Sequence, residues 1–258
     1  MYDTLILGEG IPSFYTRLGG KNYLKKRLYK LFPDEVTYTT YVEPFFGAGW
    51  LFFYKDKSPK EVINDLEKDI YYALKDIQSV SKEQLQNMDW TPSKERFMAL
   101  RESSPKKPLD RLYRFLYLTY ASFSGNRRTY NAVMATRLGT RRNTLMKRFD
   151  KIQDRLQGVT ILNQDYSKVI KKYDSPSSFF YLDPPYLDVA VRDYTHKTID
   201  IPALASQLRG LKGRFLLSYN DNPEIRKAFQ GFTIRNVETI YKSGGVHRTA
   251  KELVITNY

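Results

Sequence analysis

The first part of the chain alternates short apolar runs with segments of helical character. Apolar runs at residues 39–45 and 61–65 stand between turn residues, and segments of helical character follow them from Trp50 onward and over residues 66–80. Short apolar runs between turn signals predict buried strands, and their alternation with helices is typical of a parallel sheet. An amphipathic helix is predicted at residues 22–32, ahead of the first strand.

Strand-like runs return in the last part of the chain. Residues 160–165, 178–183 and 214–220 are such runs, each bounded by turn signals. The final two runs, at residues 233–240 and 252–258, are too close in sequence to hold a helix between them, so we expect an antiparallel pair joined by a glycine-rich loop. Helices are predicted between or after these strands at residues 168–173, 202–211 and 223–229.

The middle of the chain differs from both ends. Residues 81–157 show no strand alternation, and their clearest helices are predicted at residues 111–123 and 143–156. We therefore expect an α/β fold with a mostly parallel, Rossmann-like sheet of about seven strands, an antiparallel C-terminal hairpin and a mainly helical insertion. The catalytic domain would comprise residues 1–80 and 158–258.

Charge makes this middle segment stand out further. The chain carries a formal net charge of +14, and residues 91–157 hold sixteen Lys and Arg against five Asp and Glu, a net +11. Seven basic residues and no acid lie between Arg127 and Arg148, interleaved with Tyr130 and Asn131. A basic region of this kind favours a polyanionic partner, so the insertion is predicted to bind nucleic acid.

Other features of the composition exclude several kinds of site. The chain has no Cys and two His, which rules out disulfides and thiolate metal sites and leaves little material for a zinc centre or a Ser/His triad. It has no long apolar run and no signal peptide at its start, so we expect an intracellular (cytoplasmic) protein with no membrane segment and no metal. The oligomeric state is left open, a monomer included.

Glycines and acids gather where predicted strands end. Phe45 leads into a turn containing Gly47 and Gly49, and the next strand ends at Asp65, a position that can hold a ribose diol in α/β folds. Asp165 ends a third strand. Because the carboxyl ends of parallel strands share one edge, we expect these groups to line one crevice together with Asp183. Taken singly, Asp65 and Asp165 are equally compatible with capping the helices that follow them.

The run at residues 178–186 (SFFYLDPPY) ends in a cluster of hydrogen-bond acceptors. Pro184 and Pro185 lack backbone N–H donors, so their backbone offers only carbonyl acceptors, beside the carboxylate of Asp183 and the aromatic face of Tyr186. Such a site suits a planar group that carries an exocyclic amine. An ordinary turn after a strand is the alternative interpretation.

These segments together resemble the DNA-adenine N6-methyltransferases of the Dam type, which use S-adenosylmethionine. Residues 42–49 (VEPFFGAG) resemble the family's cofactor loop, Asp65 its ribose-binding acid and residues 183–186 (DPPY) its catalytic tetrapeptide, in the family's order and with an insertion between them. Residues 17–21 (RLGGK) resemble an additional cofactor motif, and residues 243–253 resemble the terminal hairpin. No single motif is specific to this family, but the motifs together, in this order, are.

The resemblance implies roles for individual residues. Asp183, Pro184 and Tyr186 would be catalytic. The sequence departs from the family at Arg17, where an aromatic residue is common, and at Gln164, where a glycine is often found. S-adenosylmethionine would be held by Arg17, Lys21, Phe45, Gly47, Gly49, Asp65, Asp165 and Asp183. Contacts with DNA would come from Arg127, Arg128, Tyr130, Asn131, Arg137, Arg141 and Arg142, with Arg128 the first candidate for a guanine contact.

The expected function is therefore methylation of the adenine N6 amine in a short motif of double-stranded DNA, by base flipping and direct in-line transfer. One alternative is a methyltransferase acting on cytosine N4 or on RNA; Asp183 favours adenine by resemblance, because cytosine enzymes of this type more often have Ser there. The other is a catalytically silent DNA-binding protein, against which the intact Asp65, Asp183 and Tyr186 argue. Whether the chain serves restriction-modification or acts alone is left open.

Overall fold

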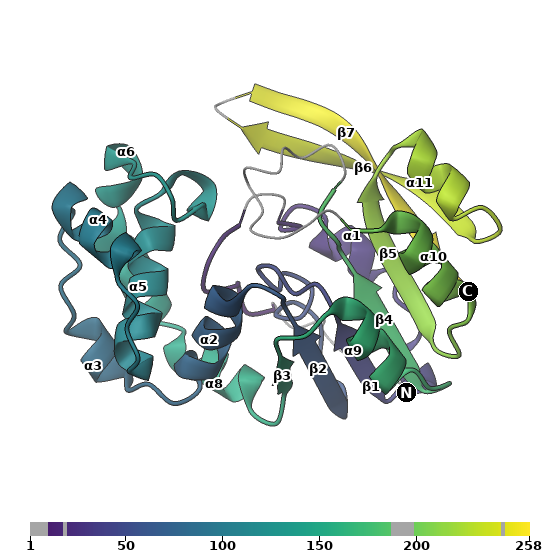
Figure 1. Cartoon of the computed structure of the whole chain (residues 1–258), viewed down its shortest axis with the longest axis horizontal. Helices are drawn as coiled ribbons and strands as arrows, with labels where there is room; N and C mark the ends of the chain where they lie inside the picture. Colours follow the sequence, from purple (N-terminus) through teal and green to yellow (C-terminus); the bar gives the residue numbers. More distant parts are fainter. Residues whose placement is uncertain (1–9, 18–19, 187–198, 244–245) are drawn as a thin grey trace, which may run out of the picture.

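The computed structural model describes residues 10–17, 20–186, 199–243 and 246–258. Two parts of the predicted motifs, Leu18 with Gly19 and Gly244 with Gly245, lie outside the described residues. A seven-stranded sheet in the order β3-β2-β1-β4-β5-β7-β6 forms the centre of the molecule (Figure 1). Its strands are β1 (Thr40–Glu43), β2 (Lys60–Asn64), β3 (Thr160–Leu162), β4 (Ser178–Leu182), β5 (Arg214–Asn220), β6 (Thr233–Ser243) and β7 (Val246–Thr256).

The direction of the strands follows the predicted pattern. β1 to β5 pair in parallel with one another, whereas β7 runs antiparallel between β5 and β6. The connection between β6 and β7 is too short for a crossover helix, which leaves only the antiparallel arrangement. The α/β fold with a mostly parallel seven-stranded sheet and an antiparallel C-terminal hairpin is confirmed.

Helices cover both faces of this sheet. In β4, Phe179 and Tyr181 pack into the core under α1 (Lys25–Tyr29) and α2 (Lys68–Ile77), because alternate side chains of a strand point to opposite faces. Phe180 and Leu182 pack on the other face. The helices there are α9 (Tyr166–Tyr173), α10 (Ile201–Arg209) and α11 (Pro223–Ala228). A strand buried on both faces explains why this run has no polar alternation.

The region after α2 is helical, as expected, and lies beside α2 at the β3 side of the sheet (Figure 1). Its longest helix, α5, packs its apolar face against α2. None of the described helices is both long and apolar enough to cross a membrane. The helices of this region are α3 (Lys82–Gln86), α4 (Lys94–Glu102), α5 (Pro108–Tyr120), α6 (Ala132–Ala135), α7 (Leu138–Met146) and α8 (Phe149–Leu156).

Two predicted helices differ from the structure. The helix expected at residues 143–156 is divided between α7 and α8, because Arg148 leaves the helical backbone with φ −123° and ψ 7°. The helix expected to start at Trp50 is a series of turns. Leu51, Phe52 and Phe53 are all buried, which one face of a surface helix cannot achieve, so tertiary packing determines this segment.

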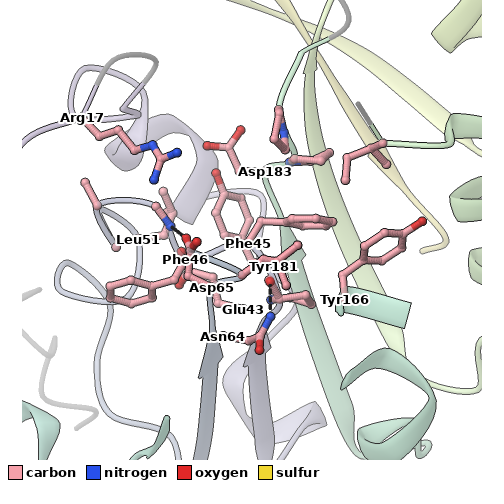
Figure 2. Close-up of a pocket in the computed structure, with 18 of the residues that line it drawn as sticks. Arg17, Glu43, Phe45, Phe46, Leu51, Asn64, Asp65, Tyr166, Tyr181 and Asp183 are labelled. Atoms are coloured by element: carbon pink, nitrogen blue, oxygen red, sulfur yellow. Dashed lines mark hydrogen bonds between the residues drawn. The ribbon is translucent and has the colours of Figure 1, made fainter. Parts of the chain in front are cut away.

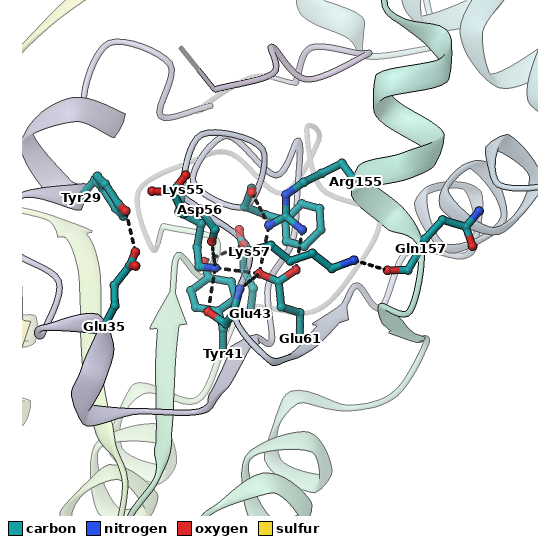
Figure 3. Close-up of polar contacts among 12 residues, drawn as sticks. Tyr29, Glu35, Tyr41, Glu43, Lys55, Asp56, Lys57, Glu61, Arg155 and Gln157 are labelled. Carbon is teal, nitrogen blue, oxygen red and sulfur yellow. Dashed lines mark hydrogen bonds and ion pairs between the residues drawn. The ribbon is translucent and has the colours of Figure 1, made fainter. Parts of the chain in front are cut away.

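A buried ion network joins the helical region to the sheet (Figure 3). Lys55 Nζ lies 2.6 Å from Glu61 Oε1 on β2, and both oxygens of Glu61 accept hydrogen bonds from Arg155 on α8. Arg155 also donates to the Phe52 carbonyl at 2.8 Å. Burial alone would raise the pKa of Glu61, but Arg155 and Lys55 hold it below its ordinary value. Two cations thus share one buried carboxylate.

Candidate active site

A cavity of about 470 Å³ opens at the carboxyl ends of β1, β2 and β4 (Figure 2). Gly47, Asp65, Asp165 and Asp183, which follow four different strands, all line it. The expected convergence of these strand ends on one crevice is therefore present. Its volume falls within the range of about 300–1,000 Å³ that is usual for small-molecule sites.

The glycine turn and Asp65 form one unit. The Gly47 N–H donates to Asp65 Oδ2 at 2.8 Å, and the Glu67 N–H donates to Asp65 Oδ1 at 2.9 Å. Gly47 and Gly49 have φ of 53° and 63°, which glycine adopts without strain, and open space lies where a side chain at Gly47 would stand. A ligand can therefore approach this backbone closely. Burial raises the pKa of Asp65, and Arg17 opposes that effect.

The N-terminal segment at residues 13–17 lies between this turn and the helical region. The Tyr15 hydroxyl donates to the Gly47 carbonyl. On its other side, the Tyr120 hydroxyl donates to the Phe14 carbonyl at 2.6 Å, and Arg148 donates to the Ser13 carbonyl at 3.0 Å. These contacts tie the glycine turn to helices far away in the sequence.

Glu67 connects two of the predicted site residues. Its Oε2 lies 2.6 Å from Nη1 of Arg17, which lines the cavity, and its Oε1 accepts a hydrogen bond from Arg127. The side chain of Glu67 is 7% exposed and that of Arg127 is 11% exposed. Arg127 has φ of 59°, unusual for a residue other than glycine. A residue predicted to face DNA thus points inward, toward the cofactor loop.

Asp183 projects into the cavity from the end of β4 (Figure 2). Its Oδ1 lies 2.8 Å from Lys21 Nζ and accepts a hydrogen bond from the Ser218 hydroxyl at 3.1 Å. Lys21 also donates to the hydroxyl of Tyr186 and lies over that ring. Burial raises the pKa of Asp183, while Lys21 and Ser218 lower it by favouring the carboxylate.

The floor and one wall of the cavity are apolar or neutral. Phe45 and Tyr166 lie with ring centroids 5.0 Å apart and provide an aromatic wall. Glu43, on β1, is 2% exposed and accepts a hydrogen bond from the Tyr41 hydroxyl at 2.9 Å. Burial raises the pKa of Glu43 well above its ordinary value, which favours the neutral acid.

Asp165 lines the cavity and also caps a helix. Its Oδ1 accepts a hydrogen bond from the Ser167 N–H at 2.9 Å, at the start of α9. The helix-capping interpretation therefore describes its geometry, and the same residue forms part of the cavity wall.

The other predicted DNA contacts differ in exposure. Arg128 and Arg137 are exposed, whereas Tyr130 packs against Phe97 with ring centroids 5.6 Å apart. Asn131 accepts a hydrogen bond from the Met134 N–H at the start of α6. The remaining two, Arg141 and Arg142, are partly buried; the first donates to the Tyr120 carbonyl at 2.8 Å and the second to the Asn143 side chain.

Several residues of the site were not predicted as such. Ser218 and Tyr219 lie on β5, beside the tetrapeptide, and Glu252 on β7 lies 3.7 Å from Lys21 Nζ. Their local sequence, a strand rich in apolar residues, gives no sign of a site. Ser218 and Tyr219 could have been found only from the pairing of β4 with β5, which a single sequence does not reveal.

Metal ligation has no support in the part of the chain that the structure describes. No group of three or more His, Cys, Asp or Glu side chains there could hold a metal ion. The acids of the cavity instead accept hydrogen bonds from backbone N–H groups, lysine and hydroxyls.

Comparison with known proteins finds methyltransferases. A family model described as D12 class N6 adenine-specific DNA methyltransferase matches residues 18–243. The type II methyltransferase M1.LlaDCHI of Lactococcus lactis subsp. cremoris is 28% identical over 269 residues, which cover 93% of each chain. M.CviBI of Paramecium bursaria Chlorella virus NC1A, also named a type II methyltransferase, is 24% identical and covers 93% of this chain and 97% of its own.

Two further proteins are similar to this chain. M.MjaIII of Methanocaldococcus jannaschii, another type II methyltransferase, is 25% identical over 88% of this chain and 91% of its own. The crystal structure of SMU.472 complexed with SAH superposes on 96% of this chain with a TM-score of 0.40 and 10% identity, and this chain spans 55% of that one.

Proposed function

The chain belongs to the D12 class of N6 adenine-specific DNA methyltransferases, and from this premise we propose how its residues carry out the reaction. As a member it methylates the N6 amine of adenine in DNA with S-adenosylmethionine as cofactor. We propose that the substrate is a short motif of double-stranded DNA and that the adenine leaves the duplex before it reacts. The type II designation of the relatives is consistent with a role in restriction-modification.

The residues of the cavity fit the cofactor. Each oxygen of Asp65 accepts one backbone hydrogen bond, so the carboxylate keeps capacity to accept from a ribose diol. The open space at Gly47 allows a ligand to approach the backbone, and Phe45 beside Tyr166 offers an aromatic wall for a planar base. We propose Arg17, Lys21, Gly49 and Asp165 as the further contacts of this site.

Asp183, Pro184 and Tyr186 act on the target adenine. The amine nitrogen is a poor nucleophile, because its lone pair is delocalised into the ring. Acceptance of its two hydrogens by the Asp183 carboxylate and the Pro184 carbonyl would pull the nitrogen toward tetrahedral geometry, while Tyr186 stacks on the base. The carboxylate that faces the cavity at the end of β4 is the single observation that carries this proposal.

The cofactor supplies an electrophilic methyl group on a sulfonium. In direct in-line transfer, the amine nitrogen would bond to the methyl carbon as the carbon–sulfur bond breaks, and the electron pair of that bond would stay on sulfur. The amine then releases one proton, to the Asp183 carboxylate or to water. The task of the protein is to orient the nitrogen and to stabilise its growing positive charge.

The helical region would hold the DNA. A base inside a duplex cannot reach the cavity, so the target adenine must flip out at a cost of a few kcal/mol. Phosphate contacts from the basic residues would compensate for this cost, and among the arginines expected to contact DNA, Arg128 and Arg137 are exposed. We propose residues 81–157 as the recognition unit and residues 1–80 with 158–258 as the catalytic unit.

One experiment tests this function. The protein is incubated with labelled S-adenosylmethionine and unmethylated DNA, and the DNA is digested to nucleosides. Label on N6-methyladenine is expected, and Asp183→Asn should lower the rate by roughly 10²–10³-fold, as loss of a charge-stabilising contact does elsewhere. The matched control is Asp154→Asn, on the exposed side of α8. Label on cytosine or nowhere, or a fully active Asp183→Asn, would contradict the proposal.

A further inference from the structure

Two neighbouring residues of β5 hold the catalytic tetrapeptide. β5 pairs in parallel with β4, and the last paired positions are Leu182 and Leu217. The register therefore brings Ser218 and Tyr219 next to Asp183, although 35 residues separate Ser218 from it in the sequence. Both β5 side chains are 0% exposed, so neither is available to contact solvent.

The Ser218 hydroxyl belongs to a short hydrogen-bond chain. A carboxylate can only accept, so Ser218 donates to Asp183 Oδ1 at 3.1 Å, and its own oxygen then accepts from the Tyr181 hydroxyl at 3.1 Å. Lys21 occupies the same Oδ1 at 2.8 Å. None of the hydrogen bonds among the described residues reaches the other oxygen, Oδ2.

Tyr219 acts on the other end of the tetrapeptide. Its hydroxyl donates to the Pro185 carbonyl at 2.9 Å, and its ring lies 4.9 Å from that of Tyr186. The Pro184 carbonyl, one residue earlier, accepts no hydrogen bond from the described part of the chain. One proline carbonyl is thus fixed to the protein, and the adjacent one is left for a ligand.

We infer that Ser218 and Tyr219 are positioning residues that assign the acceptors of this site, with Asp183 Oδ2 and the Pro184 carbonyl reserved for the two hydrogens of the adenine amine. The inference rests on the proposed function. Ser218 and Lys21 saturate Oδ1 and turn the carboxylate so that Oδ2 faces the cavity. Tyr219 fixes the Pro185 peptide and, through it, the direction of the Pro184 carbonyl and of the Tyr186 ring.

Several charged and titratable groups surround Asp183. Lys21 contacts it directly, Glu252 on β7 and Glu43 on β1 add negative or potentially negative charge, and Tyr181 completes the hydrogen-bond chain. Ser218 is the uncharged member that donates directly to the carboxylate. Its removal should therefore change the orientation and pKa of Asp183 without altering the net charge of the site.

The test compares Ser218→Ala, Ser218→Thr and Tyr219→Phe with the wild type. Ser218→Ala should lower kcat by about 10- to 100-fold, the usual range for a hydrogen bond to a charged group, with a much smaller change in KM for DNA. Ser218→Thr keeps the hydroxyl and should recover most of that loss. The acidic limb of the kcat/KM profile should move to higher pH in Ser218→Ala alone, because Asp183 then protonates more readily.

A binding measurement gives a second result that does not depend on turnover. With S-adenosylhomocysteine present, the wild type should bind DNA with adenine at the target position more tightly than DNA with purine, which lacks the amine. Ser218→Ala and Tyr219→Phe should each reduce this preference. Urea unfolding midpoints check that the variants fold.

The possible results distinguish a failure of the proposed function from a failure of the role assigned to Ser218 and Tyr219. An inactive wild type would overturn the proposed function. An active wild type with an unshifted pH profile, an unchanged preference for adenine over purine, or a Ser218→Thr variant as impaired as Ser218→Ala would overturn only the role of β5.

Discussion

Glu43 is a carboxyl group buried at the floor of the cavity, and its protonation couples the stability of the fold to pH. Burial raises the pKa of Glu43 in the folded protein, whereas the unfolded chain releases this proton near the ordinary value of about 4.3. Between these two values the folded state binds more protons, so this contribution to stability is complete below the unfolded pKa and is lost as pH rises.

Glu43→Gln removes that dependence while it keeps an acceptor for the Tyr41 hydroxyl. The difference in unfolding free energy between the variant and the wild type should therefore grow in favour of the variant as pH rises from 4 to 8. Urea unfolding at several pH values measures it, with Glu83→Gln, exposed on α3, as the control. A difference that stays constant with pH would mean that Glu43 is ionised in the folded protein.

At the scale of single residues, the sequence revealed those parts of the site that are local. Asp183 ends an apolar run and Gly47 ends another, and both features are visible within a few positions. Ser218 depends on which strands are neighbours and in what register, so it became visible only in the folded chain. Arg127 shows the same limit: the sequence gives its charge, but not that an acid 60 residues away pairs with it.

At the scale of elements, Glu61 joins β2 to α8 through two buried cations. Glu61→Gln leaves Lys55 and Arg155 buried without a counter-ion, and loss of one member of a buried pair costs about 3–5 kcal/mol. The matched control is Lys82→Met, which breaks an exposed pair with Asp150 and should cost about 1 kcal/mol or less. Urea unfolding should show this difference, and equal losses in the two variants would contradict it.

The pattern of elements was easier to predict than their ends. Strands such as β4 and β5 are recognisable because both faces are buried and turn residues bound them. The segment after Gly49 was not, because its three consecutive buried side chains meet partners from distant parts of the chain. Apolar sequence therefore located the core, while contacts remote in sequence decided whether a given segment became a helix.

At the scale of the whole molecule, the net positive charge of the chain predicts that its affinity for DNA falls as the salt concentration rises. Arg137 is exposed in the basic helical region, so a phosphate contact is the expected role. Arg137→Ala should reduce the slope of log affinity against log salt by about 1 and weaken binding equally for all sequences. Lys227→Ala, on α11, provides the control. A loss confined to one DNA motif would instead assign Arg137 to base recognition.

Glu67 joins the candidate cofactor site to the helical region, and this link predicts that the two respond to each other. Arg17 lines the cavity and Arg127 belongs to the helical region, and both pair with this one carboxylate. A ligand that orders Arg17 would also order Glu67 and, through it, the backbone at Arg127, so the proposed DNA-binding region would be organised in advance. Cofactor and DNA should therefore bind with positive coupling.

The coupling is the ratio of DNA affinities with and without S-adenosylhomocysteine, and couplings of this kind typically amount to about 5- to 150-fold. Glu67→Gln should bring the ratio close to 1. Asp69→Asn is the matched control, because Asp69 pairs with Arg114 on α5 but is absent from the cavity lining. Fluorescence anisotropy of labelled DNA measures both affinities. An unchanged ratio in Glu67→Gln, or a wild-type ratio of 1, would mean that the bridge only supports the fold.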